Sequence, residues 1–189
     1  MPLVRDHMVQ DIATFSPATT LLEAIHGMAA QRYGFAIVLD NMELSGLITQ
    51  YDMMRWMARG LDLEKKTLAD IPTSRPVHVY ESTPMQELLR IFNQRRFRRF
   101  PVLNDDEMLS GGIMERQMVE ALPRSNLLAH YRVSDMLISA PPVITPDTAY
   151  MEAVGLMVKW HRGCLLLTSD EVTLEGFISE TDLLRHRLD

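Results

Sequence analysis

The sequence predicts an α+β fold built from one unit that is repeated three times. Residues 46–52 read Gly-Leu-Ile-Thr-Gln-Tyr-Asp, and the same pattern of glycine, two apolar residues, hydroxyl and acid returns at residues 176–182. A degraded copy occupies residues 111–117, and the ends of the copies are evenly spaced (117 − 52 = 65 and 182 − 117 = 65). Around each copy, hydrophobic periodicity predicts the order strand, helix, strand, strand, helix. A fixed period of this kind indicates a repeat architecture.

Composition indicates a globular chain. Of the 189 residues, 47% are hydrophobic and 23% charged, and the apolar runs are far shorter than the ~18 residues of a membrane span. The start of the chain lacks the apolar region of a signal peptide, so we expect a soluble, cytoplasmic protein with no membrane partner. The single Cys164 excludes a disulfide or a cysteine metal cluster within one chain, and we expect no metal site. A net charge of −6 disfavours general nucleic-acid binding.

The first unit is expected to span residues 1–59. Residues 16–19 read Ser-Pro-Ala-Thr, which predicts a turn that ends in a helix cap. A continuous apolar run at residues 35–39 predicts a buried strand, and residues 44–48 predict a second strand after an Asp-Asn turn. Thr49 then begins a helix that continues through Met57.

The second unit is expected to span residues 67–122. Residues 83–86 read Thr-Pro-Met-Gln, which combines an N-cap, a first-turn proline and a capping-box glutamine. Strands are predicted at residues 100–103 and 108–114. Met114 and Gln117 replace the hydroxyl and the acid of the repeated pattern, so the second copy is degenerate.

The third unit is expected to span residues 132–189 and to open with Val-Ser-Asp-Met at residues 133–136. Its helix is predicted to place Met151, Val154, Met157 and Val158 on one apolar face, and its strands are predicted at residues 164–167 and 172–178. Residues 60–66 and 123–130 are polar or broken stretches that we interpret as linkers.

The intact copies indicate a nucleotide site. Each places a hydroxyl at the start of a helix and a carboxylate one turn later, as Thr49 and Asp52 in one copy and Ser179 and Asp182 in the other. A carboxylate offers two acceptor oxygens, which match a vicinal diol such as a ribose. The hydroxyl and the free N–H groups of the helix start suit a phosphate. The same spacing is also that of an ordinary helix cap, so both readings stay open.

Three such units, led by Val-x-Asp-x-Met at residues 4–8 or by a relative of it, resemble cystathionine-beta-synthase (CBS) domains. The resemblance covers nearly the whole chain. It implies that two units, here units one and two, pack through their small sheets as a pseudo-twofold pair. It also implies that an adenosine ligand such as AMP, ADP, ATP or S-adenosylmethionine binds in the cleft between them. The implied role is regulatory, with no catalytic residue and no catalytic cofactor.

The resemblance also assigns ligand contacts. It implies that the acids bind the ribose, that the hydroxyls face the ribose or phosphate, and that residues before each unit's first helix contact the adenine. Arginines before a central strand would reach a phosphate bound in the partner unit. The residues concerned are Thr49, Asp52, Ser179 and Asp182 for the sugar, Ile12, Ala13, Thr14, Pro142 and Val143 for the base, and Arg98 and Arg99 for the phosphate, with His161 and Arg162 as weaker candidates.

Units one and two carry complementary halves of one site. Unit one has the acid without the arginines, and unit two has the arginines without the acid. We therefore hypothesise a single nucleotide site formed by Thr49, Asp52, Arg98 and Arg99. An odd number of units leaves an unpaired apolar sheet face, which predicts a homodimer through the third units. A missing fourth unit, or pairing of units two and three, would also cover that face.

Three alternatives were weighed. The motifs of hydrolases, metalloproteases and P-loop or dinucleotide enzymes are absent, so we expect no enzyme. Residues 95–100 read Arg-Arg-Phe-Arg-Arg-Phe, a pattern found in single-strand binders, but burial of both aromatic rings is the favoured interpretation. A ligand-free oligomerisation scaffold, in which both acids only cap helices, is the main alternative function. A regulatory role implies an effector protein, which the sequence does not identify.

Overall fold

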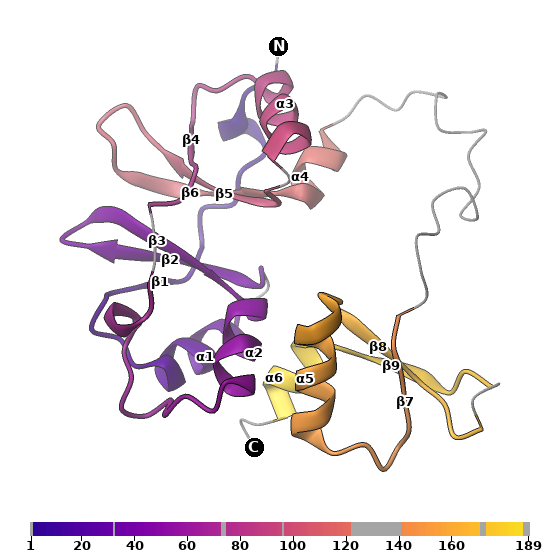
Figure 1. Ribbon diagram of the computed structural model, residues 1–189. Helices are drawn as coiled ribbons and strands as arrows, with labels where there is room; N and C mark the ends of the chain where they lie inside the picture. Colours follow the sequence, from indigo (N-terminus) through magenta and orange to yellow (C-terminus); the bar gives the residue numbers. More distant parts are fainter. Residues whose placement is uncertain are drawn as a thin grey trace, which may run out of the picture.

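The computed structural model describes residues 2–31, 33–72, 75–95, 97–121, 141–170 and 173–186, and Figure 1 shows its three small α+β units. The repeated order of strand, helix, strand, strand, helix is confirmed in all three. Unit one contains β1 (Thr14–Phe15), α1 (Leu21–Ala29), β2 (Phe35–Asp40), β3 (Glu43–Thr49) and α2 (Gln50–Ala58). Unit two contains β4 (Val79–Tyr80), α3 (Met85–Arg95), β5 (Arg99–Leu103), β6 (Leu109–Met114) and α4 (Glu115–Glu120). Unit three contains β7 (Val143–Ile144), α5 (Tyr150–Trp160), β8 (Cys164–Leu167), β9 (Gly176–Ser179) and α6 (Glu180–His186).

Each unit has one three-stranded sheet of the same topology. The central strand pairs in parallel with the first strand and antiparallel with the third. The register pairs Phe35 with Thr49, Arg99 with Met114, and Cys164 with Ser179. These pairs align the three units residue by residue. The alignment allows equivalent positions to be compared below.

Some predicted segments lie outside the described residues. They include the expected opening of unit three at residues 133–136, the linker at 123–130, the last residue of unit two and residues 187–189. Val172, the expected first residue of the last strand, is also outside them, and β9 begins at Gly176. Among the described helices, none is both long enough and apolar enough to cross a bilayer.

Units one and two pack sheet against sheet, as the sequence predicted. Phe35 and Ile37 of β2 are fully buried in one cluster with Leu103 of β5, and Figure 1 shows the two sheets stacked. Gly112 of β6 permits the close approach, because a Cβ atom there would lie 2.5 Å from Ile12 Cδ1. The shared apolar layer fixes the pseudo-twofold pair.

The leading segments of units one and two are exchanged. The 3-10 helix η1 (Val4–Asp6) packs on unit two, where the Val4 N–H donates to the Thr83 carbonyl at 2.9 Å and the Val4 side chain is buried in the unit-two core. The 3-10 helix η2 (Leu68–Asp70) packs on unit one, where the Leu68 N–H donates to the Thr19 carbonyl at 2.9 Å. The segment that precedes β4 therefore passes along unit one.

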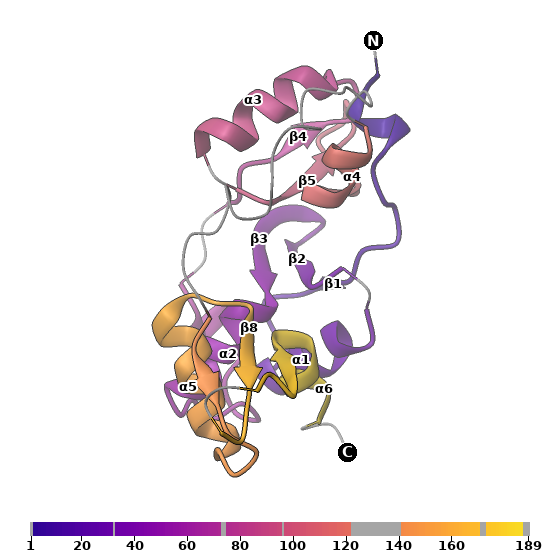
Figure 2. The same cartoon turned by 90° about the vertical axis from the view of Figure 1, so that its right-hand side faces the viewer.

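Unit three docks through its helices rather than through its sheet. Helices α5 and α6 lie beside α1 and α2 in both views (Figure 1, Figure 2). Met54 of α2, Val154 of α5 and Leu184 of α6 share one buried core. The Tyr51 hydroxyl also lies 2.6 Å from His161 Nδ1 across this contact. Of the apolar face predicted for α5, Val154 and Met157 are fully buried in this contact, whereas Met151 is 44% exposed.

Two apolar faces stay uncovered among the described residues. In the aligned units, Val119 of α4 is equivalent to Met54, yet Val119 is 65% exposed whereas Met54 is fully buried. We call the exposed Val119, together with the half-buried Leu89 and Phe92, the unit-two helix face. Phe177 of β9 is equivalent to Leu47 of the paired sheets, but it is 68% exposed. We call Val143, Leu166 and Phe177 the unit-three sheet face.

Candidate functional site

A cleft of about 510 Å³ lies between α2 of unit one and the central strand of unit two. It brings together Asp52 and Arg99, two of the residues that the sequence assigned to one site. Its volume is in the range of small-molecule sites. The residues that line it are Leu47, Ile48, Asp52, Arg55, Trp56, Arg59, Ile71, Pro72, Arg75, Pro76, Val77, Phe97 and Arg99.

Asp52 has one carboxylate oxygen committed to the helix start and one directed elsewhere. Its Oδ2 accepts from the Thr49 N–H at 2.9 Å and from the Thr49 hydroxyl at 2.6 Å, which completes a capping box. Among the described residues, its Oδ1 has only a 3.7 Å ion pair with Arg55. Asp52 can therefore cap the helix and also contact a ligand, because the cap fixes the side chain through Oδ2 and leaves Oδ1 at the cleft wall.

Arg99 is a half-buried cation in this cleft. No hydrogen bond joins its guanidinium to another described residue, and no carboxylate among them lies within ion-pair distance. Burial lowers the pKa of Arg99, an effect that the negative charges of Glu115, Glu180 and Asp52 oppose. A guanidinium carries five donors in a planar fork that matches a phosphate. Arg99 is thus the cation of the cleft best placed to receive an anion.

Two other predicted residues do not line the cleft. Arg98 is exposed and lies 3.6 Å from a Glu115 oxygen. The Thr49 hydroxyl is engaged in the capping box with Asp52. Neighbouring residues of an extended strand point to opposite sides, so only one of two consecutive arginines can reach the cleft.

The predicted adenine contacts lie at the other side of the sheet pair. Ile12 is buried between the two sheets, and neither Ala13 nor Thr14 is among the described residues that line the cleft. Their equivalents in unit two take that place, since Pro76 and Val77 correspond to Ile12 and Ala13. The exchange of leading segments is the reason, because the segment that follows η2 runs along unit one.

The sequence analysis did not identify most of the other residues that line the cleft. Arg55, Trp56 and Arg59 follow Asp52 at helical spacing on one face of α2, so their periodicity could have identified them. Arg75 enters from the exchanged segment and is held by Glu107 at 2.9 Å, a contact that no local pattern signals. Phe97 was expected to be buried, yet it is 45% exposed and stands at the cleft wall.

The pseudo-symmetric position in the same pair has a different chemistry. There, Gln117 replaces Asp52, Phe35 replaces Arg99 and Asp11 replaces Arg75. Gln117 is buried, and its Oε1 has no hydrogen-bond partner among the described residues. A position with one acidic and one aromatic group in place of two arginines does not suit a phosphate. The residues of the pair therefore favour one nucleotide site.

The predicted ligand-binding residues of the third unit do not gather at one place. Asp182 accepts from the Ser179 N–H at 2.9 Å, and its pKa is lowered by hydrogen bonds from the Ser179 side chain and backbone. The Pro142 carbonyl accepts from the Leu166 N–H at 3.0 Å, and Val143 is exposed on the unit-three sheet face. The Arg162 N–H donates to the Met157 carbonyl at 3.1 Å. None of these residues is among the described lining of the cleft.

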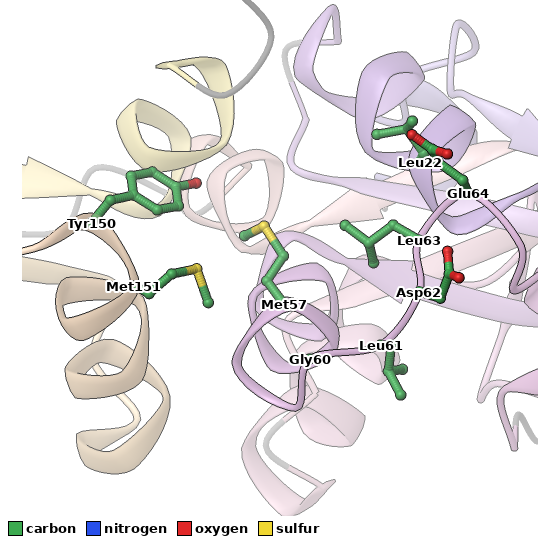
Figure 3. A pocket seen from close by; sticks show the side chains of 9 residues that line it. All are labelled: Leu22, Met57, Gly60, Leu61, Asp62, Leu63, Glu64, Tyr150 and Met151. Atoms are coloured by element: carbon green, nitrogen blue, oxygen red, sulfur yellow. The ribbon is translucent and has the colours of Figure 1, made fainter.

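A larger cavity of about 660 Å³ lies at the contact between units one and three (Figure 3). Figure 3 shows Met57 of α2 facing Met151 and Tyr150 of α5, with Asp62 and Glu64 on the neighbouring loop. Its lining is mostly apolar, and its charged groups are acids. This chemistry is opposite to what a phosphate requires. Among the described residues, no group of three His, Cys, Asp or Glu side chains could hold a metal ion.

Glu180 of α6 gives the stability of the fold a pH dependence. Burial raises the pKa of Glu180, and the charge of Arg99 offsets part of that shift. A carboxyl group whose pKa is raised on folding lowers stability above that pKa and has no effect below its unfolded value of about 4.3. We expect Glu180→Gln to raise Tm by roughly 2 °C at pH 8 and to leave it unchanged below about pH 4.

Asp182→Asn is the control for Glu180→Gln, because the pKa of Asp182 is lowered rather than raised. Its stabilising effect is present above the unfolded pKa and is lost on acidification. We expect Asp182→Asn to lower Tm at pH 8 and to have little effect in acid. Thermal unfolding across this pH range measures both variants, and equal pH profiles would contradict the assignment.

Comparisons with known proteins agree on the family. The model of the CBS domain matches residues 4–59, 68–124 and 133–189. Protein MJ1225 from Methanocaldococcus jannaschii has a similar fold over 97% of this chain and 72% of its own, with a TM-score of 0.77 and 21% identity. CBSX2 from Arabidopsis thaliana, solved in complex with AMP, is 26% identical, with a TM-score of 0.56 over 64% of this chain and 96% of its own.

A curated relative covers part of the chain. The CBS domain-containing protein CBSCBSPB5 from Arabidopsis thaliana is 31% identical over 113 residues, which are 59% of this chain. This chain spans only 21% of the length of that relative. The three matched segments together account for most of the chain. The chain therefore belongs to the CBS domain family and contains three CBS domains.

Proposed function

We propose that this chain is a non-catalytic regulatory module that binds an adenine nucleotide in the cleft between its first and second CBS domains. The observation that carries the proposal is the meeting of Asp52 from unit one and Arg99 from unit two in one cleft. One acceptor and one unpaired cation from different units form a complete site only when the pair is assembled. Binding would therefore report on the arrangement of the two domains.

The lining of the cleft matches the three parts of a nucleotide. The Asp52 carboxylate suits the ribose hydroxyls, and Arg99, with Arg55 and Arg59 nearby on α2, suits the phosphate. The exposed ring of Phe97 and the apolar surface of Val77 suit a base, because aromatic and apolar side chains stack on its face. The structure of CBSX2 with AMP supports adenine as the base.

The test is titration calorimetry with AMP on the wild type and on Asp52→Ala. We expect Asp52→Ala to weaken AMP binding about 10-fold, since it removes a charged acceptor of two ribose hydroxyls. Asp182→Ala removes the same side chain from the third unit and is expected to leave the affinity unchanged. Equal effects of the two variants would contradict the site. Absence of AMP, ADP, ATP and S-adenosylmethionine binding would favour the alternative of a ligand-free scaffold.

We further propose a homodimer formed through the unit-three sheet face. In unit one, Ile37 and Leu47 are equivalent to Leu166 and Phe177, and they belong to the apolar cluster between the two paired sheets, where Ile37 is fully buried and Leu47 partly buried. Val143 and Phe177 occupy the corresponding surface of unit three and are exposed. A second copy supplies the same face with the twofold relation that units one and two already use. A change in dimerisation would offer one route by which nucleotide binding alters the interaction with an effector protein.

Phe177→Asp tests the dimer. The wild type is expected to sediment at twice the 21.6 kDa chain mass, and Phe177→Asp at the chain mass, because a charge would be buried without a partner. Val119→Asp places the same charge on the unit-two helix face and is expected to leave the dimer intact. Sedimentation equilibrium measures both, and loss of the dimer in Val119→Asp alone would show that the wrong face was assigned.

A further inference from the structure

A third, smaller cavity of about 280 Å³ lies where the three units meet. Unit one contributes the segment before β2 and the first residue of α2, unit two contributes Arg99, and unit three contributes the α6 residues Thr181 and Arg185. Arg99 lines both this cavity and the nucleotide cleft, so the two are adjacent across one side chain. The full lining is Gln31, Tyr33, Gly34, Gln50, Arg99, Thr181 and Arg185.

The backbone at Gly34 makes room for this junction. Gly34 has a φ of 64°, a backbone conformation that residues other than glycine rarely adopt. A Cβ atom there would lie 3.0 Å from Gln50 Oε1 and 3.8 Å from a terminal nitrogen of Arg99. The glycine therefore lets Gln50 and Arg99 approach the same point. The Thr181 hydroxyl donates to Gln50 Oε1 at 3.3 Å, which connects unit three to that point.

The charges at the junction favour an anion. Arg99 and Arg185 enter the cavity from different units, and no ion pair to another described residue occupies either guanidinium. The negative groups that act on Arg99 are Glu115, Glu180 and Asp52. Glu115 lies near Arg98, and burial raises the pKa of Glu180. Asp182 also acts on Arg185, and one of its two carboxylate oxygens, Oδ2, accepts from the Ser179 cap.

We propose that the phosphate chain of a nucleotide bound in the cleft continues past Arg99 into the junction cavity, where its terminal phosphate contacts Arg185 of unit three. The proposal rests on the proposed function, and it adds the ligand class: an adenine nucleotide with two or more phosphates. Such a ligand touches all three units, whereas AMP touches the first two. Bound ADP would therefore hold unit three against the pair.

Calorimetry with AMP and ADP tests the proposal. The wild type is expected to bind ADP about 10-fold more tightly than AMP, because one further charge-assisted contact forms. Arg185→Gln is expected to reduce ADP affinity to that of AMP and to leave AMP affinity unchanged. Lys159→Gln removes an exposed cation of the same unit outside the cavity, and it is expected to change neither. Equal ADP and AMP affinities in the wild type, or equal losses in Arg185→Gln, would overturn the proposal.

Inorganic pyrophosphate separates this proposal from the nucleotide site itself. It is expected to raise the Tm of the wild type and of Asp52→Ala, but not that of Arg185→Gln. If AMP binding is absent while the pyrophosphate shift depends on Arg185, the proposed function fails and the phosphate subsite remains. If AMP binds through Asp52 while pyrophosphate gives the same shift in Arg185→Gln, the subsite is wrong and the nucleotide site remains.

Discussion

Arg99→Ala is expected to weaken AMP binding about 100-fold, a larger effect than the one expected for Asp52→Ala. Arg99 is half-buried and unpaired within the described residues, so its full donor capacity is available to a phosphate. Charge-assisted hydrogen bonds away from bulk water contribute roughly 1.5–3 kcal/mol each, and about 2.8 kcal/mol corresponds to 100-fold. Titration calorimetry at constant ionic strength measures the change.

Arg98→Ala is the matched control for Arg99→Ala. The two arginines are neighbours on the same strand, but Arg98 is exposed and paired loosely with Glu115 at 3.6 Å. We expect its removal to change AMP affinity by less than about 3-fold, as is usual for a screened surface charge. A loss of similar size in both variants would mean that net charge, rather than one positioned guanidinium, attracts the nucleotide.

Gly111→Ala is expected to lower the free energy of unfolding by about 2–3 kcal/mol. A Cβ atom at Gly111 would lie 2.2 Å from the Val9 carbonyl oxygen, which belongs to the exchanged leading segment. Val9 and Gly112 also exchange two backbone hydrogen bonds of 2.9 Å at this point. The alanine therefore has to displace backbone atoms rather than the tip of a side chain, and urea denaturation measures the cost.

Gly155→Ala adds the same methyl group where the structure has room. Gly155 lies inside α5, and a Cβ atom there would meet no heavy atom within 4 Å. Alanine in place of glycine within a helix stabilises by roughly 0.5–1 kcal/mol. The two variants should thus shift stability in opposite directions. Stabilisation by Gly111→Ala would show that the leading segment does not pack on β6.

The sequence alone was sufficient for the architecture of each unit. Periodicity and turn residues located the strands within one or two residues at β2 and β5, and the Thr49–Asp52 spacing located the start of α2. These features are local, because a strand or a capping box is specified by residues that are close in the chain. Asp52 and Arg99, which the sequence assigned to one site from the complementary loss of acid and arginines, line the same cleft, and their role as a nucleotide site stays a prediction.

The remaining errors come from contacts between distant segments. The sequence placed Ile12 at the adenine, whereas the exchange of leading segments puts Pro76 in the equivalent position at the cleft. It also gave no sign that α5 and α6 of unit three pack on the helices of unit one. The exchange of leading segments and the docking of unit three both depend on which of several similar surfaces meet. Because a repeated sequence gives each unit the same local pattern, local patterns cannot select between these surfaces.

The number of nucleotides bound per chain tests the account most directly. Three copies of one motif could supply up to three sites, but only the Asp52 copy meets an arginine at the position aligned with Arg99. In unit one, the residue aligned with Arg99 is Phe35, which faces the Gln117 copy. In unit three, the aligned residue is Cys164. Calorimetric titration with AMP is expected to give one nucleotide per chain, abolished by the double variant Asp52→Ala, Arg99→Ala. Two or more nucleotides per chain, or one that persists in this double variant, would contradict the account.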